Sequence, residues 1–421
     1  MERIYSVNEN SDYEIIVIGA GPAGCAAAVR AARDGMRVLL IEASGAAGGM
    51  ASGGLVPEFC PYTDGERIIH GGFASEILFK MKEVTPDPAE KLDYCTIDAE
   101  SLKRFMDGAL ADAGCDVLYF STVCAADAED GRVRSITVAN KSGLTVYYAR
   151  LFIDCTGDAD VAAFAGCAFE VGDSEGATQM PTLCFNLSGV NDGGKPIENM
   201  VRELLPKIIA DSEFPLIDNN FFCTMKLAQG LWGFNAGHVR GVNCLDREDI
   251  SGAMAKGREK AHQYLRALKK YMPEEFASAH ISLTAPLLGI RETRRIVGEY
   301  VLTASDYRER RSFPDEIARN SYAIDLHDAS LFYKDEDVNS RYGKYGKGDS
   351  HGIPYRTLIP EGTDNLLVAG RSISCERAVQ SSLRIIPVCL SMGEAAGAAA
   401  AIAVKDGIST REVDVASLPR K

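Results

Sequence analysis

A glycine motif, Gly19-Ala20-Gly21-Pro22-Ala23-Gly24, stands between two segments of contrasting character near the start of the sequence. The apolar run 14–18 before it is typical of a buried strand, and the alanine-rich run 22–33 after it is typical of a helix. A second apolar run, 37–41, completes the strand–helix–strand order of one unit of a parallel sheet. In this context the spacing G-x-G-x-x-G predicts a turn that holds a dinucleotide.

Each position of the motif has a physical role. Gly19 permits the tight turn, Gly21 lets the backbone approach a pyrophosphate, and Gly24 lets the helix pack closely on the strand. Pro22 and Ala23 lie in the first helical turn, whose free N–H groups and partial positive charge favour a diphosphate. A turn with a purely structural role is the alternative, and the surrounding strands and helix favour binding.

An acidic residue ends the second strand. Glu42, followed by Ala43, is placed to accept hydrogen bonds from the hydroxyl pair of a ribose. Because no arginine stands beside Glu42, the 2′-phosphate of NADP is disfavoured at this position.

The length of 421 residues predicts two domains, and one of them can be inserted into the sequence of the other. Short strands between 116 and 153, separated by Asp130-Gly131 and Ser142-Gly143, indicate a β-meander. After the meander the pattern changes from short strands to helices, at 200–210 and 247–271, and a glycine-rich linker at 339–350 ends this part of the sequence. We therefore expect an α/β fold: a Rossmann-like nucleotide-binding domain (parallel sheet plus meander) at 1–172 and 351–421, with an inserted α+β substrate or cap domain at 173–350.

Two later segments resemble known cofactor signatures. The segment 152–158, which ends in Thr156-Gly157-Asp158, resembles the second FAD signature of glutathione-reductase-like flavoproteins. The segment 366–371, which ends in Gly370-Arg371, resembles the third, where a strand ends beside the ribityl chain. The order and spacing of the three signatures imply FAD, with Val123 of the meander among its contacts.

Almost the whole chain resembles a family of FAD-dependent oxidoreductases within the glutathione-reductase-like superfamily. The supporting segments are 48–56, 153–162, 289–300, 353–356 and 382–387. The resemblance implies redox chemistry with FAD, and cofactor contacts at Gly49 and Met50. It also implies that the helix starting near Pro387 places its N-terminus, with the backbone N–H groups of Ile385 and Ile386, at the N1/O2 edge of the flavin; an ordinary helix start is the alternative. Arg384 is expected to contact the cofactor as well.

Two features of related flavoproteins are missing from the sequence. There is no second G-x-G-x-x-G motif and no C-x-x-C pair, so neither a separate NAD(P)H domain nor disulfide exchange is expected. Electrons are therefore expected to enter and leave at one face of the flavin.

The candidate catalytic residues each have a structural alternative. Arg291 and Arg295, one turn apart if helical, could hold a carboxylate or sugar hydroxyls, or could belong to a salt-bridge network. His70 is a candidate acid/base residue or covalent flavin attachment, and Tyr355 lies at the expected domain junction. Arg356, next to Tyr355, lies at the same junction. His238, His351 and Cys375 are further candidates, for which a structural role is the alternative.

Composition narrows the range of partners. The formal net charge of −14 disfavours nucleic acid and anionic membranes. The polar start of the sequence, the absence of a membrane-length apolar run and scattered cysteines predict a cytoplasmic protein with mostly reduced thiols. No metal site is predicted. The expected partners are a small-molecule substrate and an unknown electron acceptor, and a homo-oligomer is possible.

These features lead to one main hypothesis: an FAD-dependent dehydrogenase or oxidase that transfers hydride from a small polar organic substrate to flavin N5. The alternatives are a reductase fed by a soluble donor such as NADH and a non-catalytic FAD-binding protein. A polysaccharide lyase is disfavoured, since neither a metal cluster nor a paired-carboxylate signature is present.

Overall fold

The computed structural model describes residues 7–328 and 341–418, and a five-stranded parallel sheet lies at its centre. The strand order is β17-β8-β2-β3-β4, and all neighbours are parallel. From β2 the chain builds β3 and β4 on one side and returns to build β8 and β17 on the other, so the order reverses at β2. In open sheets of this kind, ligands bind beyond the carboxyl end of the strand where the order reverses. The strands are β2 (Ile15–Ile18), β3 (Val38–Ile41), β4 (Asp116–Leu118), β8 (Leu151–Asp154) and β17 (Leu366–Val368).

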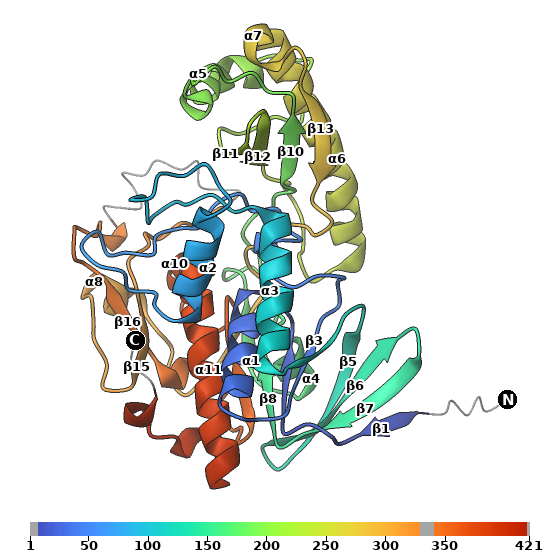
Figure 1. Ribbon diagram of the computed structural model, residues 1–421, viewed down its shortest axis with the longest axis vertical. Helices are drawn as coiled ribbons and strands as arrows, with labels where there is room; N and C mark the ends of the chain where they lie inside the picture. Colours follow the sequence, from blue (N-terminus) through green and yellow to red (C-terminus); the bar gives the residue numbers. More distant parts are fainter. Residues whose placement is uncertain (1–6, 329–340, 419–421) are drawn as a thin grey trace, which may run out of the picture.

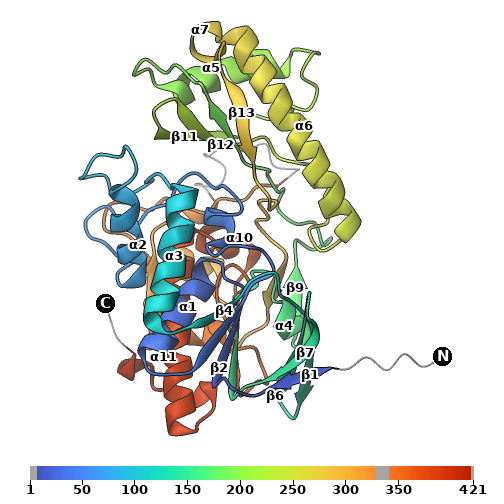
Figure 2. The ribbon, with the colours of Figure 1, turned by 45° about the vertical axis from the view of Figure 1, so that its right-hand side comes forward.

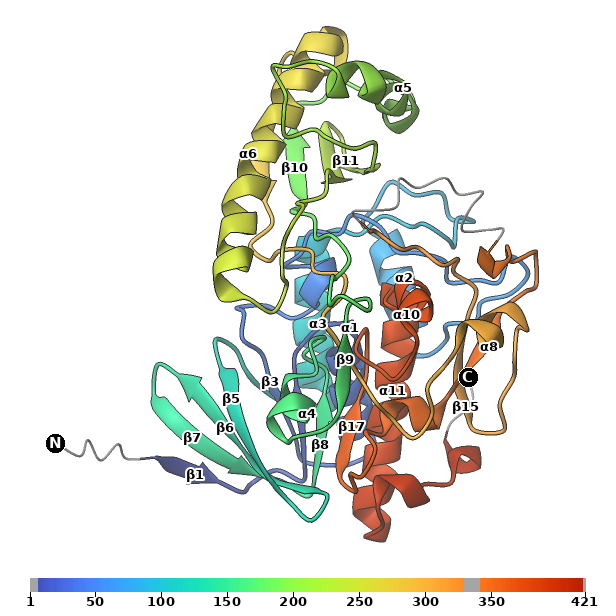
Figure 3. The same ribbon diagram turned by 180° about the vertical axis from the view of Figure 1, so that it is seen from behind.

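Both faces of the sheet are covered, which explains its uninterrupted apolar strands. Ile15 and Val17 face one core, whereas Ile16 and Ile18 face another, as the two-residue period of a strand requires. Helices α1 (Pro22–Arg33), α3 (Ala99–Ala113) and α11 (Ile386–Asp406) lie on the first face. The meander and α4 (Asp160–Phe164) lie on the second, which Figure 3 shows from behind.

Helices α1 and α11 lie side by side (Figure 1) because α11 carries glycine at its contact points. A Cβ on Gly393 would lie 2.0 Å from the carbonyl oxygen of Ala23, and a Cβ on Gly397 would lie 2.3 Å from that of Ala27. Four residues further along α11 correspond to four residues further along α1, so the two helices run parallel. By length and composition α11 is apolar enough to cross a membrane, but its residues are mostly buried in the first core, which accounts for that composition.

The meander consists of β5 (Thr122–Glu129), β6 (Arg132–Asn140) and β7 (Gly143–Tyr148), joined at its edge by β1 (Asn8–Asn10). One expectation fails here. The first of the short strands expected between 116 and 153 does not belong to the meander: Asp116–Leu118 forms β4 and pairs in parallel with β3 instead. The preceding helix α3 provides the crossover that a parallel strand needs.

A second sheet, antiparallel with the order β11-β12-β10-β13, forms the part of the molecule that we call the cap, residues 185–284. Its strands pack against a long helix and two shorter ones, and Figure 2 shows this layer standing apart from the parallel sheet. Its elements are β10 (Phe185–Ser188), α5 (Ile197–Ile209), β11 (Phe222–Ala228), β12 (Leu231–Ala236), α6 (Arg247–Tyr271), α7 (Pro273–Phe276) and β13 (His280–Thr284).

The cap has its own hydrophobic core, which extends from Phe185 to Ala279. This core is shorter than the predicted insertion at 173–350, because Leu302, Tyr307 and Ile324 are buried in the first core with α11. Residues 339 and 340 of the predicted linker lie outside the described residues. The remaining elements used below are α2 (Phe73–Lys82), β9 (Phe169–Val171), β14 (Arg294–Ile296), α8 (Ala304–Arg308), β15 (Glu316–Asn320), β16 (His351–Pro354) and α10 (Arg377–Leu383).

Candidate functional site: a cofactor cradle and a histidine pair under the cap

The glycine motif forms the turn from β2 into α1, and two of its glycines have no room for a side chain. Gly19 has a φ of +93°, and a Cβ there would lie 2.5 Å from the carbonyl oxygen of Cys155. A Cβ on Gly24 would lie 1.8 Å from the carbonyl oxygen of Gly19. Both contacts are far below van der Waals distance, so larger residues would push α1 away from the sheet.

The third glycine of the motif borders open space. A Cβ on Gly21 would meet nothing within 4 Å. Gly21 is also the N-cap of α1, and no side chain caps that helix end. Gly49, with a φ of +51°, lies against Gly21, where a Cβ would be 2.8 Å from the Gly21 Cα. The result is an uncapped helix N-terminus with open backbone beside it, which fits a bound diphosphate.

Glu42 closes one side of this turn. Its Oε2 accepts a hydrogen bond of 2.7 Å from Ala20 N, and its Oε1 accepts one of 2.7 Å from Ser44 N. A carboxylate has further acceptor capacity, so these bonds orient it and leave lone pairs for ribose hydroxyls. Ala43 is exposed next to it, and Val123 is half-buried on β5.

The second and third predicted signatures meet in an ion pair. Arg371 Nη2 lies 2.6 Å from Asp158 Oδ1, and the guanidinium lies over Gly157, where a Cβ would be 2.6 Å from Nη1. Thr156 Oγ1 donates to the buried carboxylate of Asp154 at 2.7 Å. Gly370 needs its φ of +106° to place Arg371 there. The Nε of Arg371 is buried and has no partner within the described ranges, so it can still donate to a phosphate or ribityl oxygen.

The N-terminus of α11 extends past the start of α1 toward the cap. Because Gly393 contacts Ala23, Ile386 lies ~10 Å further along the helix axis. Ile385 is the N-cap, and no side chain caps this helix either. The adjacent Arg384 directs its guanidinium to Asp325, with Nη2 3.0 Å from Oδ2.

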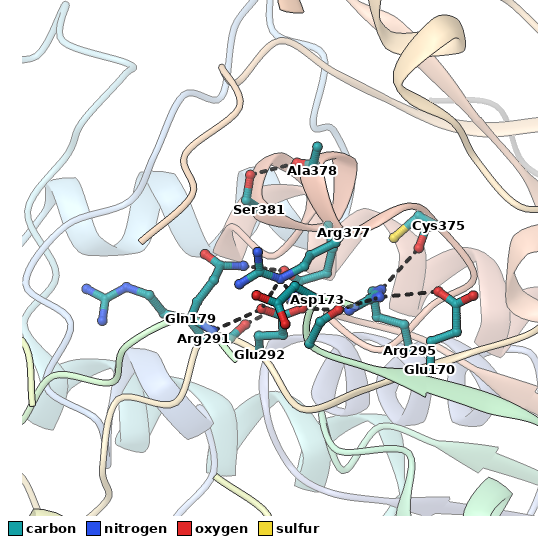
Figure 4. A network of polar contacts seen from close by, with 12 residues as sticks. Glu170, Asp173, Gln179, Arg291, Glu292, Arg295, Cys375, Arg377, Ala378 and Ser381 are labelled. Carbon is teal, nitrogen blue, oxygen red and sulfur yellow. Dashed lines mark hydrogen bonds and ion pairs between the residues drawn. The ribbon is translucent and has the colours of Figure 1, made fainter. Parts of the chain in front are cut away.

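The arginine segment is extended rather than helical, because Arg294–Ile296 forms β14 against β9. Figure 4 shows that Arg295 belongs to a buried network. Arg295 Nη1 lies 2.6 Å from Oε1 of Glu292, and Arg377 Nε lies 3.0 Å from Oε2 of the same carboxylate. Glu292 is fully buried. The structure therefore gives Arg295 an internal counter-ion and does not bring it together with Arg291.

Arg291 points the other way in the same view, toward the cap. Its Nη1 donates to the carbonyl oxygen of Met180 and to Thr182 Oγ1, both at 2.9 Å. Its guanidinium lies over the Phe221 ring, with Cζ 5.2 Å from the ring centroid. Burial lowers the pKa of Arg291 to about 10.

Other predicted candidates lie in the first core or, like Arg356, at its partly exposed edge. His70 is fully buried, its Nδ1 lies 3.0 Å from Ser391 Oγ, and burial lowers its pKa to about 3. Tyr355 is buried and donates to the carbonyl oxygen of Thr410 at 3.0 Å. Arg356 pairs with Asp315. Burial raises the pKa of the Cys375 thiol to about 12, so the thiol is not activated.

A chain of polar groups that the sequence analysis did not assemble connects the cap to α11. His238, just after β12, places Nε2 2.8 Å from Nδ1 of His327. Nε2 of His327 lies 3.0 Å from Oδ2 of Asp325. The same oxygen accepts from Tyr322 Oη at 3.1 Å and from Arg384. The residues come from the cap, the segment after β15 and the α10–α11 junction, so only the tertiary fold brings them together.

The pKa values of Asp325, His327 and His238 determine which group donates and which accepts in each hydrogen bond between them. Burial alone would raise the pKa of Asp325, but His327, Arg384 and Arg291 outweigh it and hold that pKa well below its usual range. Burial lowers the pKa of His327 to about 4 and that of His238 further still. At neutral pH the carboxylate is therefore ionised and both imidazoles are neutral.

An ionised carboxylate only accepts hydrogen bonds, so His327 must donate from Nε2 and accept at Nδ1. His238 must then donate from Nε2, which leaves the lone pair on its Nδ1. Within residues 7–328 and 341–418 no group is hydrogen-bonded to that Nδ1, which is buried. The Phe221 ring stacks on the imidazole, with centroids 4.4 Å apart and planes 19° apart. His238 Nδ1 is thus a buried basic nitrogen with no hydrogen-bond partner in the described part of the chain.

The glycine turn, the free helix ends and the strand-order reversal are those of a dinucleotide-binding protein with a Rossmann-like α/β fold. The sequence profile of the FAD dependent oxidoreductases matches residues 14–421, so the chain belongs to that family and FAD is its cofactor. The predictions of fold class, family and cofactor are confirmed.

The chain is also similar to several solved structures, including the following three. A geranylgeranyl bacteriochlorophyll reductase-like protein from Thermoplasma acidophilum has 12% identity and a TM-score of 0.47, over 95% of this chain and 80% of its own. The p-nitrophenol 4-monooxygenase of Pseudomonas putida has 12% identity and a TM-score of 0.48, over 96% and 82%. A myxobacterial chondrochloren halogenase has 13% identity and a TM-score of 0.47, over 96% and 77%.

Proposed function

We propose that this FAD-dependent oxidoreductase dehydrogenates a small polar substrate that carries a hydroxyl or amine, and that His238 takes the proton. The observation that supports this most strongly is the lone pair on Nδ1 of His238, which is buried and has no hydrogen-bond partner among the described residues. The hydrogen bonds that lead to Asp325 fix its orientation. A neutral imidazole at this position can accept a proton from a bound hydroxyl or amine. FAD supplies the complementary chemistry when bound, since it accepts a hydride.

The polar chain can spread the charge that proton transfer creates. When Nδ1 of His238 gains a proton, its Nε2 proton can pass to Nδ1 of His327 across the 2.8 Å contact. His327 then carries the positive charge 3.0 Å from the ionised Asp325. The carboxylate therefore stabilises the protonated histidine pair, and Arg384 and Tyr322 hold the carboxylate in place.

Shielding adds to this function. Phe221 is half-buried and stacks on His238, so it covers one face of the imidazole and limits its contact with bulk solvent. The neighbouring side chains Tyr322, Asp325 and Arg384 are only partly buried, so the region between the cap and α11 is not sealed.

The test is an anaerobic screen of the FAD-loaded protein against small alcohols, hydroxy acids, amines and amino acids, read by loss of flavin absorbance. We expect bleaching by a hydroxyl- or amine-bearing compound and none by NADH alone. Rapid bleaching by NADH with no other active compound would overturn the proposal in favour of a reductase. A fully loaded flavin that no compound bleaches would overturn it in favour of a non-catalytic FAD-binding protein.

A further inference from the structure

Arg291 is a buried cation whose hydrogen-bond partners are all neutral. Only 7% of the residue is exposed. Its Nη1 contacts a carbonyl and a hydroxyl oxygen, and its Nη2 contacts the amide oxygen of Asn235 at 3.4 Å. In the part of the chain that the structure describes, no carboxylate lies within 4.0 Å of this guanidinium. Arg291 therefore has no counter-ion among the residues that the structure describes.

The other well-buried arginines near it show that this is unusual. Arg295 and Arg377 share Glu292, Arg371 pairs with Asp158, and Arg384 pairs with Asp325. Burying an uncompensated charge costs several kcal/mol, so buried charges are usually paired or bind ligands. The 3.4 Å contact to Asn235 is long for a hydrogen bond, and the Nε–H has no partner among the described residues, so the guanidinium keeps donors for an anion.

Arg291 is connected to His238, the proposed base, through Thr182 and Phe221. Thr182, whose hydroxyl accepts from Arg291, pairs with His238 in an antiparallel β-bridge. Side chains that are paired in this way stand on the same face of the strands. The ring of Phe221 contacts both the guanidinium and the imidazole of His238. Arg291 and His238 therefore border one region under the cap.

We propose that Arg291 binds the carboxylate of the substrate, which would be a small acid with a hydroxyl or amine near its carboxylate. The inference rests on the proposed function for the second group, which His238 would contact. A planar guanidinium with free donors can bind a carboxylate through two parallel hydrogen bonds, which fixes the orientation of the substrate.

Binding of an anion would also strengthen the base. Burial lowers the pKa of His238 most, and Arg291 is the next largest cause. A carboxylate on Arg291 offsets its charge and removes that part of the shift. The base would therefore become most effective when an acid is in place.

The test measures equilibrium binding to the FAD-loaded protein by calorimetry, using glycolate, lactate and mandelate, each against its uncharged amide. We expect at least one acid to bind and its amide to bind at least about 30-fold more weakly. Arg291→Met should raise the Kd of the acid by about 30-fold or more, and Arg291→Lys by less. Arg202→Met, on an exposed part of the cap, is the control and should leave the Kd unchanged.

A second variant covers the case in which Arg291→Met does not fold. Asn235→Asp places a carboxylate beside Nη2 of Arg291, so it should raise the melting temperature and abolish acid binding. Equal binding of acids and amides would overturn the proposal, as would unchanged acid binding in both variants. Loss of FAD from Arg291→Met with acid binding intact would also overturn it, since Arg291 would then contact the cofactor. Binding that depends on Arg291 without bleaching by any compound would support the anion site and overturn the proposed function.

Discussion

Replacing Gly393 by alanine tests the packing that positions the start of α1. The added Cβ would lie 2.0 Å from the Ala23 carbonyl oxygen and 2.7 Å from its carbon, so the two helices must separate by about 1 Å. Overpacking of this kind costs roughly 1–3 kcal/mol, while alanine gains about 1 kcal/mol over glycine in a helix. Because the first turn of α1 borders the predicted diphosphate site, we expect lower stability and at least a roughly tenfold weaker affinity for FAD.

The matched control is Gly108→Ala in α3, where a Cβ meets nothing within 4 Å. The same chemical change should stabilise the protein there by about 0.5–1 kcal/mol and leave FAD affinity unchanged. Urea unfolding measures the free energy, and fluorescence titration of the apoprotein with FAD measures the affinity. Stabilisation by Gly393→Ala, or tight FAD binding after it, would refute the close packing of α1 on α11.

Three further predictions address the buried polar groups. Glu292→Gln should lower the free energy of unfolding by urea by about 3–5 kcal/mol, because two buried arginines lose their carboxylate. The control is Glu170→Gln, whose side chain is 67% exposed and whose loss should cost less than about 1 kcal/mol. Equal losses of stability in the two variants would contradict the network. Burial lowers the pKa of His351 to about 3, so between that value and about 6.5 the unfolded chain binds a proton that the folded protein does not, and stability falls as pH falls. His351→Gln should reduce this slope by up to about 1.4 kcal/mol per pH unit between pH 6.5 and 5, and an unchanged slope would show that His351 does not contribute. Mass spectrometry after brief alkylation of the native protein should find Cys124, the only exposed cysteine, modified first; early modification of Cys375 would contradict its burial.

The sequence indicates much of the secondary structure because the local signals agree with one another. The helix expected at 247–271 has those bounds in the structure, and the Asp246 side chain caps it by accepting from Glu248 N and Asp249 N. The meander follows from its turn residues. The strand at 116–118 is misassigned because a short β pattern does not reveal which sheet it joins, and the helix before it was the available indication of a parallel strand.

A candidate cofactor site could be outlined from the sequence because the residues expected in it follow strand ends in a fixed order. The polar chain under the cap could not be outlined in this way. His238 and His327 are far apart in the sequence, and neither stands in a motif. The spacing Asp325-x-His327 was a weak local signal, since alternate residues of an extended segment share a side. The partner of Arg295 depends on β14 being extended. Because the arginine-rich sequence fits a helix as well as a strand, the directions of Arg291 and Arg295 could not be predicted from it.

The role of His238 is tested most directly by single-turnover kinetics. The FAD-loaded wild type and His238→Asn would be mixed anaerobically with the compound that bleaches the flavin in the screen, and the rate of bleaching would be followed. If Nδ1 of His238 takes the substrate proton, the variant should bleach about 10²–10⁴-fold more slowly, with unchanged FAD content and substrate affinity. An equal bleaching rate in the two proteins would contradict the assignment of His238 as the base.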